Sequence, residues 1–176
     1  MIQTRGAKVP TLRTERLQLV ALEARHFEAF AELHSDPETV KYIGDGMPLD
    51  RVAAWLHLAM LLGHWDLRGY GVWAVEDAAT GELIGRAGLL HPEGWPDAEL
   101  NWIIKPSLRG RGFATEAARA ALDFAFDQLG FDRVISLVRP DNSASGQVAA
   151  KLGGSLDETI EFMNSPMHVF RYERTK

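Results

Sequence analysis

The sequence predicts a single α/β domain, and three observations lead to this fold class. The chain has 176 residues, of which 46% are hydrophobic and 24% charged, values that suit one domain with a full core. An apolar segment at 98–104 is followed by a glycine-containing turn and by a long helix with apolar residues at a three-and-four spacing. Two more apolar segments, at 70–76 and 82–90, flank turn residues and favour an antiparallel hairpin.

The elements before this hairpin are expected to be short. Residues 1–13 have the character of a loose lead-in, so the domain itself is assigned to 14–176. Asp50 lies near the start of a helical segment, where a carboxylate interacts favourably with the helix dipole. The expected elements are a strand at 17–22 and helices at 26–34 and 49–65.

The elements after the long helix alternate again between strand and helix. Gly153 and Gly154 follow a short helical segment and are typical of a helix C-terminus. A turn around 164–166 is expected to join the last two strands. The expected elements are a strand at 133–138, a helix at 141–152 and strands at 156–163 and 168–173.

The stretch 103–117 is the most informative part of the chain. Free backbone N–H groups, the positive end of a helix dipole and the arginines Arg109 and Arg111 would meet in one small concavity. This suits a polyanion, most simply a pyrophosphate held by the N–H groups from Gly110 to Thr115. A side chain at Gly110 or Gly112 would keep phosphate oxygens away from these donors. The alternative is an ordinary loop whose glycines only turn the chain.

Two common phosphate loops do not fit this stretch. A P-loop needs Lys after its glycine and then Ser or Thr, whereas this chain has Arg111, Gly112 and Phe113. A dinucleotide-binding fingerprint needs a third small residue where Thr115 stands, and it usually lies in the first strand–helix unit of its domain. A nucleotide-binding protein is therefore the weaker alternative.

The stretch resembles the acetyl-coenzyme A loop of the GNAT superfamily of N-acetyltransferases, whose motif is Arg/Gln-x-x-Gly-x-Gly/Ala. Arg109, Gly112 and Ala114 occupy the motif positions. Segments 14–17 and 114–117 resemble in particular the branch of the ribosomal-protein N-terminal acetyltransferases, which is RimJ/RimL-like. The resemblance implies a mixed, mostly antiparallel sheet with flanking helices, splayed at the cofactor site so that the strand backbone can bind the pantetheine arm. The residues that it assigns to the acetyl donor are Ile103, Ile104, Arg109, Gly110, Arg111, Gly112, Phe113, Ala114, Thr115, Asn142 and Ser145.

The resemblance also implies acetyl transfer from acetyl-coenzyme A to a primary amine in a ternary complex, without a metal or a covalent enzyme intermediate. Glu99 is the candidate base, because its position matches the glutamate that similar enzymes use and because a carboxylate in an apolar strand is costly unless a pocket solvates it or a partner pairs with it. The alternatives are a glutamate exposed at the rim or one paired with an arginine such as Arg86. A catalytically idle sensor of acyl-coenzyme A remains the alternative function.

Asn142 and Ser145 match an Asn-x-x-Ser segment of the family. The resemblance implies that Asn142 contacts the pantetheine arm and that Ser145 is a candidate proton donor to the leaving thiolate. Many relatives carry a tyrosine acid four residues later, where this chain has Ala149. A water molecule or direct release of the thiolate therefore stays open, as do purely structural roles as an N-cap and a first-turn serine.

The acceptor side is less defined by the sequence. Trp102 and His168 are the candidate substrate-binding residues, His168 because it lies on a late strand that could reach the acceptor site. The other histidines are expected to be solvated or to cap helices. No cysteine and no i, i+4 pair of histidines supports a metal site. Neutralising an α-amine at pH 7 costs about 1 kcal/mol and a lysine roughly 4–5, which mildly favours a weakly basic acceptor such as a protein N-terminus.

The charge and the hydropathy pattern limit the partners. A net charge of −5 argues against nonspecific binding of nucleic acid and mildly favours cationic acceptors. The first ten residues lack the apolar core of a signal peptide, and no apolar run approaches the roughly 20 residues of a membrane span. A cytoplasmic protein is expected. Dimers are frequent among similar proteins, so a homodimer is open beside a monomer.

Overall fold

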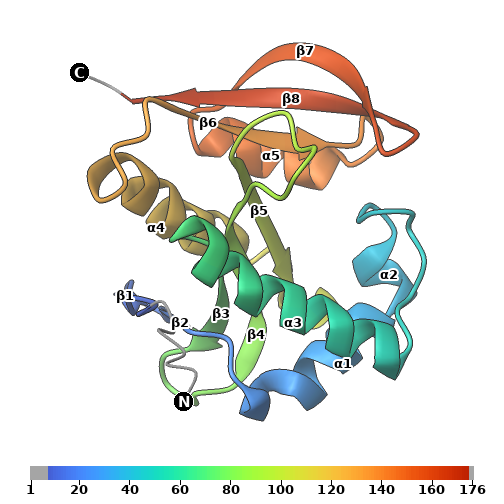
Figure 1. Cartoon of the computed structure of the whole chain (residues 1–176), viewed down its shortest axis with the longest axis vertical. Helices are drawn as coiled ribbons and strands as arrows, with labels where there is room; N and C mark the ends of the chain where they lie inside the picture. Colours follow the sequence, from blue (N-terminus) through green and yellow to red (C-terminus); the bar gives the residue numbers. More distant parts are fainter. Residues whose placement is uncertain (1–7, 175–176) are drawn as a thin grey trace.

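An eight-stranded mixed sheet in the order β1-β2-β3-β4-β5-β6-β8-β7 organises the computed structural model, which describes residues 8–174 (Figure 1). Only the pairing of β5 with β6 is parallel, and all other neighbours are antiparallel. Helices cover both faces of the sheet. The predicted α/β class with a mostly antiparallel mixed sheet is confirmed.

The first strands are β1 (Leu12–Arg13), β2 (Leu17–Val20), β3 (Val72–Asp77) and β4 (Leu83–Leu90). The strands β3 and β4 form the expected hairpin. The expected lead-in lies partly outside the described residues, but its end differs from a loose segment: Leu12 and Arg13 pair with β2, and the indole of Trp73 donates to the carbonyl of Pro10 at 2.8 Å. The end of this segment is therefore part of the sheet.

One face of β3 and β4 is covered by α1 (Phe27–Ser35) and α3 (Arg51–Arg68), and η1 (Ala24–His26) and α2 (Pro37–Val40) adjoin α1. Phe30 and Leu61 are the buried centre of this layer. The side chain of Asp50 caps α3, accepting from the N–H of Ala53 at 2.7 Å, as its position in the sequence indicated. Gly69, in the left-handed conformation with φ of 77°, ends the helix.

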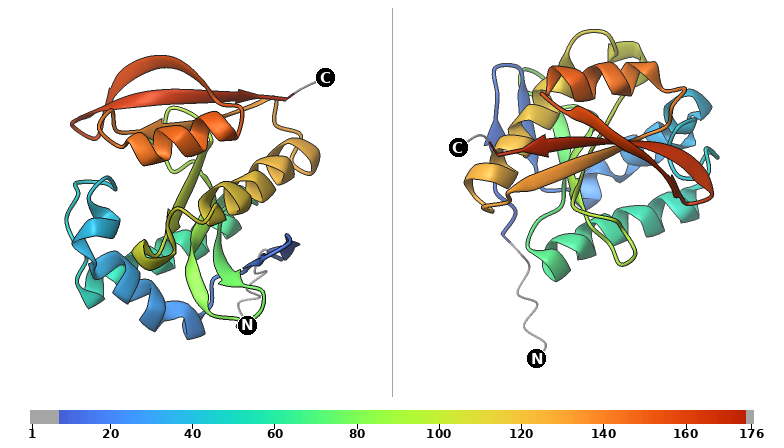
Figure 2. Two further views of the ribbon diagram at one scale, coloured as in Figure 1. Left: turned by 180° about the vertical axis from the view of Figure 1, so that it is seen from behind. Right: turned by 90° about the horizontal axis from the view of Figure 1, so that it is seen from above.

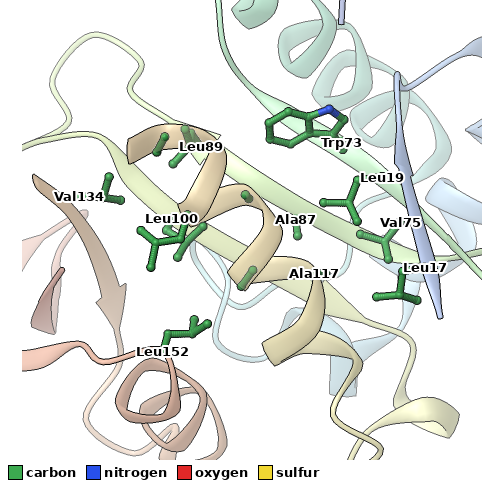
Figure 3. Packing of buried hydrophobic residues seen from close by; sticks show 14 of the residues in the cluster. Leu17, Leu19, Trp73, Val75, Ala87, Leu89, Leu100, Ala117, Val134 and Leu152 are labelled. Carbon is green, nitrogen blue, oxygen red and sulfur yellow. The ribbon is translucent and has the colours of Figure 1, made fainter. Parts of the chain in front are cut away.

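The opposite face of the sheet packs against α4 (Phe113–Asp127). The small side chains of Ala117, Ala118 and Ala121 are fully buried and let the helix approach Leu89 and Leu100 of the sheet closely (Figure 3). Because α4 starts at the end of the glycine turn, this packing fixes the position of the predicted phosphate loop.

The sheet parts between β5 (Glu99–Ile104) and β6 (Arg133–Val138). The two strands pair only at Glu99 and Ile135, where the N–H of Ile135 donates to the carbonyl of Ala98 at 3.0 Å. From Leu100 onward no strand of the described residues 8–174 pairs with this edge of β5, and η2 (Pro106–Leu108) then leads into the glycine turn. The expected splay of the sheet is thus confirmed.

The C-terminal elements are α5 (Ser143–Lys151), β7 (Ser155–Phe162) and β8 (Ser165–Glu173). Figure 2 shows them with β6 at one end of the molecule, in orange and red. The last hairpin turns at Met163 and Asn164, both with positive φ, slightly before the expected turn. Pro166 lies inside β8, where only β7 pairs with it because the pairing with β6 starts at His168. No helix in residues 8–174 is long and apolar enough to cross a membrane.

Candidate active site

A cavity of about 650 Å³ opens where β5 and β6 part. Its walls come from β4, β5 and β6, from the starts of α4 and α5, and from the segment between α1 and α3. All the predicted site residues line it except Arg111 and His168. Those that do are Glu99, Trp102, Ile103, Ile104, Arg109, Gly110, Gly112, Phe113, Ala114, Thr115, Asn142 and Ser145.

The glycine turn has the backbone conformation that its sequence suggested. Gly110 and Gly112 have φ of 75° and 84°, in the left-handed region that disfavours any other residue. Gly112 is the N-cap of α4, and no side chain caps this helix. Within the part of the chain that the structure describes, no hydrogen bond occupies the N–H groups from Gly110 to Thr115. The turn therefore offers a row of free donors at a helix N-terminus, which fits an anionic group.

The two arginines of the turn lie differently. Arg109 lines the cavity, and its guanidinium donates to the carbonyls of Ile104 at 3.4 Å and Glu38 at 3.3 Å. Arg111 is exposed, and its guanidinium lies 5.1 Å from the ring centre of Phe113. Of the two, Arg109 is therefore the one that can contact a ligand in the cavity.

The start of the domain braces this turn from behind. The carboxylate of Glu116 accepts from the hydroxyl of Thr14 at 2.6 Å and from the backbone N–H of Arg16 at 2.9 Å, and it pairs with the Arg16 guanidinium at 2.6 Å. The Arg16 guanidinium also donates to the carbonyl of Arg111 at 2.9 Å and lies over the ring of Phe113. The two segments that resemble one enzyme branch, 14–17 and 114–117, are thus in direct contact.

The open edge of β5 presents main-chain groups with which no other strand of residues 8–174 pairs. The carbonyl of Leu100 faces β6, where the hydroxyl of Ser136 donates to it at 2.7 Å, whereas the carbonyl of Ile103 faces Gly85 of β4. Because main-chain groups alternate along an antiparallel pair, those of Trp102 and Ile104 face the opening. Of the two predicted isoleucines, Ile104 therefore turns its backbone to the opening, where its carbonyl accepts from Arg109 at 3.4 Å, and Ile103 offers its side chain.

The start of α5 forms the wall across from this edge. Asn142 is the N-cap, and its side-chain oxygen accepts from the N–H of Ser145 at 3.1 Å. The hydroxyl of Ser145 has no hydrogen-bond partner within residues 8–174. Ala149, where many relatives carry a tyrosine, is fully buried in the core. Ser145 is thus a free hydroxyl on the cavity wall.

Glu99 lies at the register where the strands part. The indole N–H of Trp95 donates to its carboxylate at 2.7 Å. Burial raises the pKa of Glu99 to about 7, against the opposing effects of the Trp95 hydrogen bond, the positive charge of Arg86 and the Leu137 backbone. The carboxyl can therefore exchange a proton near neutral pH. The predicted alternative of a direct pair with Arg86 is not formed, because Arg86 binds Asn101 instead.

A polar cluster that the sequence did not reveal lies beside Glu99. The Arg86 guanidinium donates to the side-chain oxygen of Asn101 at 2.6 Å and to a ring nitrogen of His34 at 3.3 Å, and the ring of His57 lies 5.2 Å from that of His34. His34 is 52 positions away from Arg86 in the chain, so no local pattern joins them. The feature of the sequence that could have pointed to this cluster was Arg86, a charged residue inside the apolar segment 82–90.

The expectation for the histidines needs correction in part. His34 and His64 are buried, because each finds a hydrogen-bond partner in the protein interior instead of solvent. His26 is buried as well, but it caps as expected, since its ring nitrogen Nδ1 accepts from the backbone N–H of Glu23 at 3.0 Å at the start of η1. His168 bonds to Thr159 of β7 at 2.9 Å and does not line the cavity, so the structure does not bring it to the site. Trp102 lines the cavity but packs with the core cluster around α4, on the face of β5 opposite to Glu99.

Two arginines connect the walls of the cavity. Besides the bond from Arg109 to Glu38, the guanidinium of Arg139 donates to the carbonyl of Gly44 at 2.8 Å. These two bonds therefore hold the segment 36–49 to the glycine turn and to the end of β6. Residues 8–174 contain no group of three or more His, Asp or Glu side chains that could hold a metal ion.

A split sheet, a glycine turn at a helix N-terminus on one side and a titratable carboxyl on the other are features that suit a group-transfer protein. The chain belongs to the acetyltransferase (GNAT) family, whose domain model matches residues 16–155. Proteins of this family are acetyl-coenzyme A-dependent N-acetyltransferases, and this chain is one of them.

Similar proteins cover nearly the whole chain. The uncharacterised protein YkkB of Bacillus subtilis is 33% identical over 93% of this chain and 94% of its own length. The FsC-acetyl coenzyme A-N(2)-transacetylase of Aspergillus fumigatus is 32% identical over 86% of this chain and 67% of its own. An acetyltransferase structure from Agrobacterium tumefaciens is 35% identical, with a TM-score of 0.84 and coverage of 94% and 95%.

The branch that the sequence resembled also appears among the solved structures. The ribosomal L7/L12 α-N-protein acetyltransferase RimL, solved in complex with coenzyme A, has a TM-score of 0.79 over 93% of this chain and 98% of that one. At 16% identity this likeness concerns the fold alone.

Proposed function

We propose that this chain transfers the acetyl group of acetyl-coenzyme A to a primary amine, with Glu99 as the base. The observation that carries the proposal is the carboxyl of Glu99, which lines the cavity at the point where β5 and β6 part, and burial there raises its pKa to about 7. The name of the A. fumigatus relative, which refers to acetyl transfer from acetyl coenzyme A to a nitrogen, supports this reaction class.

The residues of the cavity fit the donor. The free N–H groups of Gly110 to Thr115, with Arg109, would hold the pyrophosphate, and the open edge at Trp102 and Ile104 would hydrogen-bond the pantetheine arm. Asn142 would contact the same arm from α5. The bound donor supplies the acetyl thioester, and all other steps fall to the acceptor and to side chains of this chain.

The reaction balances without a metal. An ammonium acceptor first loses a proton to Glu99, directly or through water, and the neutral amine attacks the acetyl carbon. A C–N bond forms, the C–S bond breaks, and coenzyme A leaves as its thiolate. The attacking nitrogen gives up its second proton as the amide forms. The free hydroxyl of Ser145 is the candidate that passes a proton to the thiolate and recovers one from that nitrogen, directly or through water. A homodimer and the cytoplasmic location stay predictions from the sequence.

The variant Glu99→Gln tests this role, since the amide keeps the size of the side chain but cannot take a proton. We expect kcat to fall by about 10²–10⁴ while the affinity for acetyl-coenzyme A is unchanged. Release of coenzyme A gives the rate, and calorimetric titration gives the affinity. The matched control is Glu161→Gln, on exposed β7, which should leave both values as they are.

Two outcomes would contradict the proposal. Full activity in Glu99→Gln would remove the base from the mechanism. Tight binding of acetyl-coenzyme A by the wild-type protein without turnover of any amine would favour a sensor.

A further inference from the structure

A buried cation faces the acceptor side of the cavity. Arg86 lies on β4 and is only 4% exposed, and it lines the same cavity as Glu99. The register places Arg86, Gly88 and Leu90 opposite Ile103, Asn101 and Glu99 of β5. Directly opposed residues share a face of the sheet, so the Arg86 and Glu99 side chains lie on one face, with Asn101 between them.

The charge of Arg86 interacts with the carboxylate of Glu99 only from a distance, without forming an ion pair. Within residues 8–174 no carboxylate lies at ion-pairing distance, and its partners are the neutral amide of Asn101 and a ring nitrogen of His34. Burial lowers the pKa of Arg86 to about 10, which still leaves it charged at neutral pH. Burial of a guanidinium without an anion in contact is costly. An anionic group that reached Arg86 would therefore be bound favourably.

The side chains around Arg86 do not supply that anion. Burial, and then the charge of Arg86, lower the pKa of His34 to about 3 and that of His57 to about 4, so both rings are neutral at pH 7. His57 also has a buried ring nitrogen, Nε2, without a hydrogen-bond partner. The other two acids of the lining, Glu38 and Asp45, are exposed to solvent.

We propose that Arg86 binds a carboxylate of the acceptor, so that the acceptor is a small amine that also carries a carboxylate, such as an amino acid or a short peptide. The proposal rests on the proposed acetyl transfer and names the acceptor class of that same site. The amine would face Glu99 while the carboxylate faces Arg86, both on one face of the sheet. It replaces the preference for cationic acceptors that the net charge of the chain suggested.

The test compares acceptors that differ only in this charge. The probes are free amino acids and dipeptides, each with its C-terminal amide, and spermidine as a polycation. Release of coenzyme A is measured for each. At least one free acid should have a kcat/KM about tenfold or more above that of its amide, because the charge-assisted bond to Arg86 is made only by the acid. Removing the carboxylate does not make an amine harder to deprotonate, so amine basicity cannot produce this preference.

The variant Arg86→Gln separates recognition from a structural role. We expect the kcat/KM of the acid to fall about tenfold or more and that of the amide to stay nearly constant. If Arg86 only held Asn101 and His34 in place, both acceptors would lose activity alike. Arg86→Lys keeps a cation if the glutamine variant fails to fold, and Arg13→Gln, exposed on β1, is the matched control.

Equal use of acid and amide by the wild-type protein, or a preference for the amide or for spermidine, would overturn this inference and leave acetyl transfer intact. If no amine is acetylated, the proposed function fails instead. In that case the carboxylate site is tested by the thermal stabilisation that the acid and the amide each give in the presence of coenzyme A. Stabilisation by the acid alone, lost in Arg86→Gln, would support the site. Equal stabilisation by acid and amide would reject it.

Discussion

At the scale of the residue, the proton affinity of Glu99 results from two opposing surroundings. Burial raises the pKa of its carboxyl to about 7, whereas the indole N–H of Trp95 favours the charged form through a 2.7 Å hydrogen bond. The base form is the carboxylate, so activity should increase as the pH rises through about 7 and level off above it.

The variant Trp95→Phe should move this profile. It removes the indole donor but keeps an aromatic ring beside Phe162, whose ring centre lies 5.0 Å away. Since the charged form of Glu99 loses a hydrogen bond, we expect the midpoint of the kcat/KM–pH profile to shift upward. Trp55→Phe, exposed on α3, is the control. A midpoint that stays in place or moves down would show that the hydrogen bond from Trp95 does not lower the pKa of Glu99.

The residues also divide into those that the sequence could identify and those that it could not. Gly110, Gly112 and Asn142 work through their own backbone or their first helical turn, so a local pattern was enough. Arg86 and His34 meet only because β4 packs against α1, and nothing local indicates that contact. The position of His168 also depends on tertiary contacts. Its place on a late strand did not reveal that its ring bonds to Thr159 of β7 and lies outside the cavity lining.

At the scale of the element, α4 begins at the proposed donor site, and the start of the domain contacts the first turn of this helix. Burial raises the pKa of Glu116, but bonds from Thr14 and Arg16 outweigh this and lower it overall. The carboxylate is therefore charged at neutral pH and fixes the first turn of the helix. The turn at Gly112 stands directly against this brace, because a side-chain atom there would lie 3.3 Å from the Arg16 guanidinium.

The variant Glu116→Gln should weaken donor binding without touching the donor. It removes the ion pair with Arg16, and hydrogen bonds to a charged group contribute about 1.5–3 kcal/mol. If part of that energy positions the N–H groups of the turn, the Kd for acetyl-coenzyme A should rise by roughly tenfold. Calorimetric titration measures it, with Glu15→Gln, on the exposed neighbouring position, as the control. An unchanged Kd would mean that the turn keeps its shape without the brace.

Element boundaries followed the sequence closely where a cap or a turn marks them, as at Asp50. The boundaries differed from the sequence-based expectation where strand pairing between distant segments determines them. The strand β1 exists only because β2 lies beside it, and Pro166 is tolerated in β8 only because β6 does not reach it. Neither condition can be seen in the residues themselves.

At the scale of the whole molecule, the parallel pairing of β5 with β6 joins two parts of the sheet through a single register pair. A donor in the cavity would contact β5 and α4 on one side and α5 on the other. Binding should therefore stabilise the molecule as a whole and not one loop of it.

A thermal-shift titration measures this effect. At a hundredfold excess over its Kd, acetyl-coenzyme A should add about 2.7 kcal/mol, which raises the Tm by roughly 5–10 °C for a chain of this size. Coenzyme A should act in the same way, and ATP and NAD should not. A stronger response to ATP would show that the turn at Gly110 to Thr115 serves a nucleotide instead.

The open edge of β5 has a consequence for how this enzyme could diversify. The proposed donor half of the cavity relies mostly on main-chain groups, and every residue except proline carries both N–H and C=O. Most substitutions in β5, or in α4 after the glycine turn, would therefore leave it in place. The acceptor half inferred above would be made of side chains, namely Arg86 with His34 and His57 near it. One or two substitutions there would redirect the same acetyl donor to a different amine. A lineage of such proteins can thus keep one donor and exchange its acceptors.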